Sequence, residues 1–361
     1  MRASPGAARL RPYVCLIKGT RILFLDPEFF LRIVVGMASP LNIWCNAKFA
    51  EPAERLLVEG VQPHRVVFSA QASASVLTPG QIDPALAQAD IAFGQPPVEQ
   101  AMACDRLRWI TLTSAGFTNY DREDFREAML RRRAALTNAS SVFAEPCAQH
   151  VLAMMLALGR QLLPSHQTQL TDRAWLFSER RAQSRLLNGQ TVLLLGFGAI
   201  GRRVAELLAP FHVKLYAVRR KAYSEPGVHI ISEERLSSVI AEADHVVNVL
   251  PDNPTTRNYV NARRLSWCKP GAHFYNVGRG TTVDQHALIE ALASGRLGAA
   301  YLDVMMPEPL PPSDRLWYAP NCFITPHSAG GRHDQDEALV RHFTKNLAAF
   351  LSGEAMADRV L

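Results

Sequence analysis

Three charged or titratable side chains in the second half of the chain have the chemistry of an acid-base site. Arg279 follows an apolar run, Glu308 lies between two prolines, and His327 follows a Thr-Pro pair. Arginine keeps its positive charge and can hold a carboxylate with two parallel hydrogen bonds. Imidazole exchanges a proton near neutral pH, and a nearby carboxylate favours its charged form. Together these residues predict a site that binds an anion and transfers a proton.

Each of these residues also has an ordinary structural interpretation. Arg279 alone would be a surface ion-pair partner, His327 a loop residue that caps the following helix, and Glu308 part of an exposed turn. All three, however, lie where strands end or loops begin. The carboxyl ends of the strands form the ligand-binding crevice of an open parallel sheet, so we expect the three side chains to converge there. Other histidines are expected to be core or surface residues: His150, His229, His245, His286 and His342.

A glycine-rich turn lies upstream of these residues, between an apolar run and a helical pattern. Residues 191–201 read Thr-Val-Leu-Leu-Leu-Gly-Phe-Gly-Ala-Ile-Gly. Gly196 would allow the sharp bend, Gly198 the close approach of backbone to a pyrophosphate, and Gly201 the tight packing of helix on sheet. The free amides at the helix N-terminus would face the anion. The turn therefore predicts a dinucleotide site with contacts from Gly196, Gly198, Ala199, Ile200 and Gly201.

The residues after the next apolar run predict which dinucleotide is preferred. Arg219, Arg220 and Lys221 follow residues 213–218, and Arg219 lies 18 residues beyond Gly201. Enzymes that prefer NAD usually place an Asp or Glu near this position to bond the ribose 2′-hydroxyl. Guanidinium groups instead bind a 2′-phosphate and stack on the adenine. A solvated basic turn is the alternative, but at this position the arginines favour NADP(H), with NAD(H) the less favoured cofactor.

Composition indicates an ordinary globular protein that is long enough for two domains. The chain has 361 residues, of which 48% are apolar and 20% charged. The net charge is +6, but residues 1–36 carry +4 of it, so nucleic acid is not an expected partner. Six scattered cysteines and the absence of metal-ligand spacing in the sequence predict reduced thiols, no metal site and a cytoplasmic location. No apolar segment reaches the roughly 18 residues of a membrane span, so no membrane association is expected.

Short apolar runs alternate with helical patterns from Leu41 onward, which predicts parallel sheets covered on both faces. The expected strands are 42–45, 65–68, 91–93, 109–113, 191–195, 213–218, 245–250, 273–277 and 300–304. The expected helices are 52–59, 84–88, 98–104, 122–130, 146–163, 203–208, 232–243, 283–293 and one after Pro326. We expect the helix 146–163, with Pro146 in its first turn, to connect two halves. The last helix should pack back on the first half.

The pattern divides the chain into three segments. Residues 1–36 show neither strand alternation nor a helical face, and we interpret them as an extension or as the result of a start codon assigned upstream of Met37. A targeting arm is the rival interpretation, because the segment is rich in arginine. Residues 37–140 with 331–361 are expected to form a substrate domain, and residues 141–330 a dinucleotide-binding domain.

Four motifs in a fixed order give residues 40–355 a resemblance to the D-isomer-specific 2-hydroxyacid dehydrogenases. They are the glycine turn, Asn276-Val-Gly-Arg-Gly, Asp303-Val followed by Glu308-Pro, and Thr325-Pro-His. The run Leu250-Pro-x-x-Pro-x-Thr also looks like the family's. The resemblance implies two doubly wound α/β domains with parallel sheets, a flavodoxin-like substrate domain and a Rossmann dinucleotide-binding domain. It further implies a homodimer.

The resemblance also implies roles for individual residues. Arg279 would hold the substrate carboxylate and polarise the ketone, and His327, oriented by Glu308, would deliver the proton. Ala115 and Gly116 would bind the substrate carboxylate through backbone amides. Asp303 would bond the nicotinamide carboxamide. Further cofactor contacts are implied at Pro251, Thr256, Val277, His327 and Gly330.

These observations predict an oxidoreductase that passes a hydride from NADPH to a small 2-keto acid and gives the D-2-hydroxy acid. Glyoxylate and hydroxypyruvate are the expected substrates, because Arg219 in place of an acid is typical of family members that resemble their reductases. One alternative is a larger 2-keto acid. Another is a non-enzymatic dinucleotide sensor similar to the family's corepressors. Glu308 argues against formate dehydrogenase, and the short segment after the last helix against a phosphoglycerate dehydrogenase with a regulatory domain.

Overall fold

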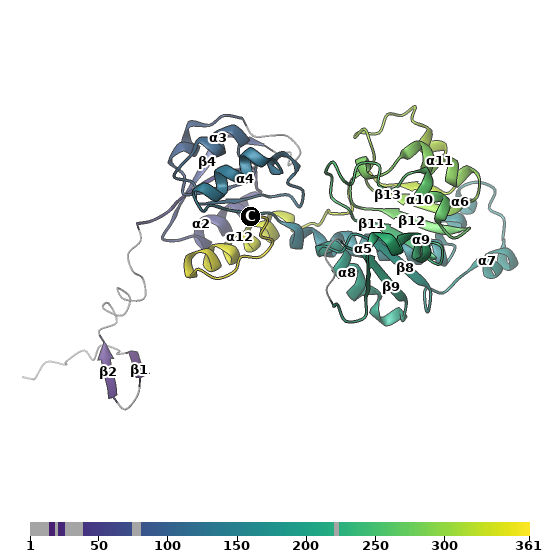
Figure 1. The fold of residues 1–361 in the computed structure, drawn as a ribbon, viewed down its shortest axis with the longest axis horizontal. Helices are drawn as coiled ribbons and strands as arrows, with labels where there is room; N and C mark the ends of the chain where they lie inside the picture. The colour runs from purple at the N-terminus through teal and green to yellow at the C-terminus, as the bar shows by residue number, and fades with distance from the viewer. Residues whose placement is uncertain (1–13, 19–20, 26–38, 74–80, 220–223) are drawn as a thin grey trace, which may run out of the picture.

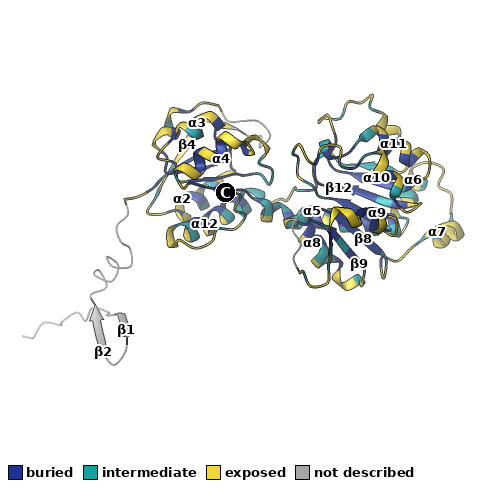
Figure 2. Ribbon diagram, viewed as in Figure 1, coloured by how far each residue is buried: buried dark blue, intermediate teal, exposed yellow. Residues whose placement is uncertain are grey.

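The computed structural model contains two parallel β-sheets joined by the long helix α5 (Ser140–Gly159), as Figure 1 shows. The residues that it describes are 14–18, 21–25, 39–73, 81–219 and 224–361. Buried residues form clusters on both faces of each sheet, which is the pattern of parallel strands covered by helices. Figure 2 shows the strands of the larger sheet mostly in the colour of buried residues. The prediction of two doubly wound α/β units is therefore confirmed.

The smaller sheet has five parallel strands in the order β4-β3-β5-β6-β7, the flavodoxin type of winding. The strands are β3 (Asn42–Ala47), β4 (Arg65–Ser73), β5 (Ile91–Phe93), β6 (Trp109–Thr111) and β7 (Ala135–Thr137). Its helices are α2 (Glu51–Gly60), α3 (Val98–Ala103) and α4 (Glu123–Arg131), with short 3₁₀ turns η1 (Pro84–Gln88) and η2 (Thr118–Tyr120). The sequence predicted four of these strands but missed β7.

The larger sheet has seven parallel strands in the order β10-β9-β8-β11-β12-β13-β14, so the winding reverses between β8 and β11. The strands are β8 (Thr191–Leu195), β9 (Lys214–Val218), β10 (His229–Ile231), β11 (His245–Asn248), β12 (Ala272–Asn276), β13 (Leu297–Leu302) and β14 (Cys322–Ile324). The helices are α8 (Ala199–Leu208), α9 (Leu236–Ile240), α10 (Ala262–Trp267) and α11 (Gln285–Ala293), with 3₁₀ turns η3 (Ala209–Phe211), η4 (Glu233–Arg235), η5 (Gly280–Thr282) and η6 (Arg315–Tyr318). The reversal puts a crevice at the carboxyl ends of β8 and β11.

The final helix α12 (Gln335–Ser352) crosses back to the five-stranded sheet, as predicted. Leu339, Phe343 and Leu347 are buried in the core on one face of that sheet. The Phe343 ring stacks on Phe93, with 4.4 Å between the ring centroids, and on Trp109, with 5.3 Å. The end of the chain therefore completes the core of the first unit.

Two predicted helices differ from those observed. Helix α5 begins at Ser140, so Pro146 lies inside it rather than in its first turn. It ends at Gly159, and α6 (Leu162–Leu170) and α7 (Phe177–Gln183) follow as separate helices. The region predicted as helix at 84–88 is the 3₁₀ turn η1. The first error arises because apolar periodicity locates the body of a helix, whereas its ends depend on tertiary contacts. The second concerns only the type of helix, since η1 has the predicted bounds.

Helix α5 also corrects the expectation about membrane-spanning length. Its 20 residues are long and apolar enough for a span by length and composition alone, which is weak evidence because core helices meet the same criterion. Val151 and Met155 are buried against the seven-stranded sheet, and Val142 against the five-stranded one. Contacts with two cores therefore account for the buried apolar residues of this helix, which are 39% of its apolar window.

The N-terminal segment contains a hairpin of β1 (Val14–Lys18) and β2 (Arg21–Leu25). The strands are antiparallel, with Val14 opposite Leu25. Residues 1–36 are interpreted as an extension because their sequence shows no strand alternation, and the structure contains two paired strands within them. The other residues of this segment, and Met37, lie outside the described ranges.

Candidate active site

The glycine turn between β8 and α8 has the backbone geometry that its sequence predicts. Gly196 has a φ of +97°, which residues with a Cβ rarely adopt. A Cβ at Gly201 would lie 3.1 Å from the carbonyl oxygen of Gly196, so helix and strand pack closely here. A Cβ at Gly198 would meet no described heavy atom within 4 Å. Gly198 therefore faces open space at the start of α8, where a phosphate group fits.

A cleft of about 800 Å³ begins at this turn and reaches the five-stranded unit. Loops that follow β8, β11 and β12 line one side of it, and residues near the ends of β6 and β7 line the other. The predicted contact residues that line the cleft are Gly196, Gly198, Ala199, Ile200, Gly201, Pro251, Val277 and Arg279, with Ala115 and Gly116 opposite. The structure thus brings together residues that lie more than 150 positions apart in the sequence.

Other predicted cofactor residues shape the cleft without being among its described lining residues. The Thr256 hydroxyl donates to the carbonyl oxygen of Pro251 at 2.6 Å and so fixes the turn after β11. A Cβ at Gly330 would lie 3.2 Å from the Phe143 ring, so this glycine allows close packing on α5. Arg219 follows β9, and its amide donates to the carbonyl oxygen of Ile231. Arg220 lies outside the described residues.

Arg279 reaches across the cleft to the opposite unit. A Cβ at Gly116 would lie 2.4 Å from Nη2 of Arg279, so the guanidinium rests against the Gly116 backbone. Nη1 of Arg279 donates to the carbonyl oxygen of Gly278 at 2.7 Å. Nδ2 of Asn276 donates to the Arg279 carbonyl oxygen at 3.2 Å and steadies the loop. The predicted cation and the predicted carboxylate-binding loop therefore lie in direct contact.

A hydrogen-bond network that the sequence did not reveal holds the loop of Ala115 and Gly116. The Ser114 hydroxyl donates to the carbonyl oxygen of Gly116 at 2.7 Å, and Nδ2 of Asn138 donates to that of Ala115 at 2.8 Å. Nε2 of Gln95 donates to the Ser114 hydroxyl at 3.1 Å. These partners come from three different strand ends, so no local motif could have indicated them.

His327 and Glu308 form the predicted pair. Nδ1 of His327 lies 2.7 Å from Oε2 of Glu308, and the Met305 amide donates to Oε1 of Glu308 at 2.9 Å. The bond to Glu308 raises the pKa of His327 and outweighs the opposing effect of burial. Burial alone would raise the pKa of Glu308, but His327 and the Met305 amide lower it. The positive charge of Arg279 makes a smaller contribution that lowers the pKa of each group, so the guanidinium acts within range of the pair.

Asp303 anchors the loop that carries His327. This residue is buried, and its Oδ1 accepts hydrogen bonds from the Thr325 hydroxyl at 2.6 Å and from the amides of Ser328 at 2.8 Å and Ala329 at 3.0 Å. The Asp303 carbonyl oxygen accepts from the His327 amide at 2.8 Å. The sequence indicated a cofactor contact at Asp303 and gave no sign of this second role.

Several cleft residues carried no signal in the sequence. They are Phe117, Thr118, Asp121, Arg126 and Val360. Nη2 of Arg126 lies 3.2 Å from Oδ1 of Asp121, and the two form an ion pair on the side of the cleft that carries Ala115 and Gly116. Among the described residues, no group of three or more His, Cys, Asp or Glu is placed to hold a metal ion. Arg279 lines the cleft, whereas His327 and Glu308 are not among its described lining residues and lie within range of the charge of Arg279.

Comparison with known proteins agrees with this geometry. The sequence model described as D-isomer specific 2-hydroxyacid dehydrogenase, NAD binding domain, matches residues 152–329. A glyoxylate reductase from Pyrococcus furiosus is 30% identical over 256 residues, which cover 69% of this chain and 74% of that relative.

Two solved structures share the fold over most of this chain. A D-isomer specific 2-hydroxyacid dehydrogenase from Xanthobacter autotrophicus Py2, in complex with NADPH and MES, is 26% identical with a TM-score of 0.74 and covers 90% of this chain and 98% of its own. An NADPH-dependent glyoxylate/hydroxypyruvate reductase from Sinorhizobium meliloti, in complex with NADP and malonate, is 25% identical with a TM-score of 0.67 and covers 89% and 97%.

The fold, the cleft and these similarities define an NAD(P)-dependent oxidoreductase. The chain belongs to the D-isomer specific 2-hydroxyacid dehydrogenase family, and residues 152–329 match the family's NAD-binding domain. The predicted family is confirmed.

Proposed function

We propose that the protein is an NADPH-dependent reductase that converts a small 2-keto acid, of the glyoxylate or hydroxypyruvate type, to the D-2-hydroxy acid. The observation that carries the proposal is the hydrogen bond between His327 and Glu308 within range of the charge of Arg279. The relatives named as glyoxylate and glyoxylate/hydroxypyruvate reductases support the substrate class.

The residues of the glycine turn fit a dinucleotide. Gly198 offers its backbone to the pyrophosphate, because no described atom stands where its Cβ would be, and the amides at the start of α8 face the same space. Arg219 supplies positive charge after β9, where a 2′-phosphate is held in this fold, and this supports NADPH over NADH. We assign Arg220, the next residue in the sequence, to the same phosphate. We assign Oδ2 of Asp303 to the nicotinamide carboxamide, since the donors named above all use Oδ1.

The substrate carboxylate would be held from both sides of the cleft. The Arg279 guanidinium provides one side, and the backbone amides of Ala115 and Gly116 provide the other. This arrangement neutralises the carboxylate and polarises the adjacent carbonyl group. Bound NADPH supplies the hydride. Residues 37–140 with 331–361 would thus act as the substrate domain, and residues 141–330 as the dinucleotide-binding domain.

His327 would deliver the proton. Its Nδ1 is bonded to Glu308, so Nε2 is the nitrogen that can face the substrate oxygen. The raised pKa favours the protonated ring, and Glu308 fixes its orientation before and after the proton leaves. In the oxidative direction the same nitrogen would accept the hydroxyl proton.

The test is a panel of 2-keto acids assayed with NADPH and with NADH. We expect oxidation of NADPH by glyoxylate or hydroxypyruvate, and we expect Arg219→Asp to shift the preference toward NADH. If NADPH binding survived that substitution, the 2′-phosphate assignment would be wrong. If NADPH bound but no 2-keto acid oxidised it, the protein would be a dinucleotide sensor instead of a reductase.

We also propose that the protein acts as a homodimer through residues 162–186. Neither α6 nor α7 contains a buried residue, and Figure 1 shows α7 at the outer edge of the molecule. Trp175 is 92% exposed, and Leu162, Leu170, Phe177 and Leu186 are also exposed. Apolar surface of this kind is stabilised by burial against a second copy. Trp175→Ser with Phe177→Ser should give a monomer in sedimentation velocity, and an unchanged dimer would contradict this interface.

A further inference from the structure

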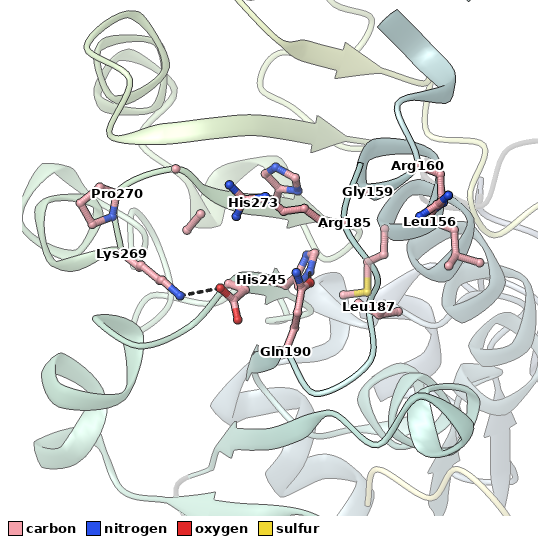
Figure 3. Close-up of a pocket in the computed structure, with 14 residues that line it drawn as sticks. Leu156, Gly159, Arg160, Arg185, Leu187, Gln190, His245, Lys269, Pro270 and His273 are labelled. Atoms are coloured by element: carbon pink, nitrogen blue, oxygen red, sulfur yellow. Dashed lines mark hydrogen bonds and ion pairs between the residues drawn. The ribbon is translucent and has the colours of Figure 1, made fainter. Parts of the chain in front are cut away.

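A second cavity lies at the amino ends of β11 and β12, the opposite end of the sheet from the cleft. Figure 3 shows its walls, in which His245 and His273 are register partners on neighbouring strands. The cavity has a volume of about 40 Å³, against about 800 Å³ for the cleft. A buried water needs roughly 10–15 Å³ on this measure. The space therefore suits a small ion or a terminal group and excludes a dinucleotide.

The walls carry more positive than negative charge. Arg160, Arg185 and Lys269 line the cavity, and Asp244 is the one carboxylate among its described lining residues. Nζ of Lys269 lies 2.6 Å from Oδ1 of Asp244 and pairs with it (Figure 3). The two arginines thus leave an excess of positive charge around the cavity. Arg185 lies beside His273 in the figure.

The two histidines differ in how their nitrogens are satisfied. His245 is bonded on both sides, with the Tyr275 hydroxyl 2.9 Å from Nδ1 and the Gln190 side chain at Nε2. Nδ1 of His273, in contrast, is buried and has no hydrogen-bond partner among the described residues. Leaving such a buried group without a partner is unfavourable. Burial and the charge of Arg185 both lower the pKa of His273, so its environment already contains uncompensated positive charge.

We propose that this cavity is a binding site for a small phosphate group, either inorganic phosphate or a phosphomonoester. Nδ1 of His273 and the Arg185 guanidinium donate hydrogen bonds to it, and Lys269 adds charge. Asp244 sets the preference among anions. Its oxygens accept from Lys269 and the Thr191 amide and retain lone pairs, so they can accept a bond from a protonated phosphate but not from sulfate, which has no proton to donate.

The site is independent of the proposed reaction, since the cavity shares no described lining residue with the cleft. A ligand in the cavity would contact the amino ends of β11 and β12, whereas the cleft lies at the carboxyl ends of the same strands. His245 begins β11, and the loop with Pro251 follows that strand. His273 belongs to β12, and the loop with Arg279 follows it. Phosphate bound here would stabilise the NAD-binding unit whether or not the protein reduces 2-keto acids.

The experiment measures the thermal midpoint of the full chain with saturating NADPH, so that phosphate cannot report on the cleft. Inorganic phosphate, methyl phosphate, sulfate and chloride are compared at equal ionic strength. At ten times its Kd, phosphate should raise the midpoint by roughly 3 °C, and sulfate should act like chloride. A matching shift with methyl phosphate identifies a monoester as the ligand, and its absence identifies inorganic phosphate.

Two variants and a control make the result specific. Arg185→Gln and, separately, His273→Phe should abolish the phosphate shift, whereas Arg65→Gln, an exposed arginine in the five-stranded unit, should keep it. Broadening of the phosphate ³¹P signal should be lost in the same two variants. A shift retained in Arg185→Gln, an equal shift with sulfate, or no shift with phosphate would each overturn the proposal, the last outcome meaning that water satisfies His273.

Discussion

Two histidines at opposite ends of the seven-stranded sheet have opposite pKa shifts. His327 follows β14 at the carboxyl end, and its bond to Glu308 raises its pKa. His245 begins β11 at the amino end, where burial and the neighbouring His273 lower its pKa to about 3. Each ring is bonded through Nδ1, at 2.7 Å and 2.9 Å. The difference therefore does not come from the presence of a hydrogen bond.

The charge of the partner decides the difference. Glu308 is a carboxylate and stabilises an imidazolium, whereas the Tyr275 hydroxyl and the Gln190 amide around His245 are neutral and do not offset its desolvation. The environment of His327 therefore favours the charged imidazolium, whereas that of His245 favours the uncharged ring. Only the first arrangement is suited to acid catalysis, and the comparison can be tested by altering each partner.

The largest effect is expected from removal of the His327 ring. His327→Asn should lower kcat for 2-keto acid reduction by about 10²–10⁴-fold, because a general acid contributes that much. NADPH affinity, measured by fluorescence titration, should not change. His286→Asn, an exposed histidine on α11, is the matched control and should keep full activity. A mild loss in His327→Asn would remove this residue from the mechanism.

The next effect concerns the contact across the cleft. Arg279→Gln should reduce kcat/KM by roughly 10²–10³-fold through loss of charge. Gly116→Ala should cost up to about 10²-fold, because the new Cβ would displace the guanidinium that now lies 2.4 Å from that position. If the contact between Arg279 and Gly116 matters, the double variant that carries both substitutions will lose no more kcat/KM than Arg279→Gln alone. Additive losses would mean that the two residues act separately.

These expectations also show which parts of the molecule could be predicted from sequence. The glycine turn and the order of Arg279, Glu308 and His327 were recognisable, because local residue type and spacing fix the backbone and the chemistry there. The support of the Ala115–Gly116 loop by Gln95 and Asn138 was not, since it depends on strands brought together by folding. For the same reason Val360 gave no sign that it lines the cleft.

The amino end of the sheet illustrates a second limit. His245 was expected to be a core or surface residue, and it is buried, but no pattern indicated that His273 would face the same cavity with an unbonded nitrogen. Their juxtaposition depends on the register of β11 with β12. Register follows from packing of whole strands, which the sequence specifies collectively.

A smaller effect, on stability, is expected at His245. Its folded pKa is below the unfolded value of 6.5, so the unfolded state binds more protons and stability is lost as pH falls from 6.5 toward about 3. His245→Gln removes the titrating group and with it this pH-dependent loss of stability. Urea unfolding between pH 4 and 7 should therefore show a shallower loss of free energy in the variant than in the wild type. Equal slopes would contradict a buried neutral ring.

The smallest effect is expected from the His327–Glu308 ion pair on stability. The contribution of His327 to stability is fully present below pH 6.5, the unfolded pKa, and is lost as pH rises through the raised folded pKa. The contribution of Glu308 is fully present above pH 4.5, the unfolded pKa, and is lost as pH falls through the lowered folded pKa. The pair therefore stabilises fully between 4.5 and 6.5, by less than about 1 kcal/mol because both side chains are partly exposed. Unfolding of His327→Asn should differ more from wild type at pH 5.5 than at pH 9, and the reverse order would exclude the pair.

The pH dependence of kcat in wild type and Glu308→Gln, measured side by side at saturating NADPH and substrate, tests most directly whether Glu308 keeps His327 protonated for reduction. The wild-type rate should fall as pH rises through a pKa above 6.5. Glutamine can still accept the hydrogen bond but carries no charge, so the variant's rate should fall at a lower pH. An inflection at the same pH in both proteins would show that the carboxylate does not set the proton on His327.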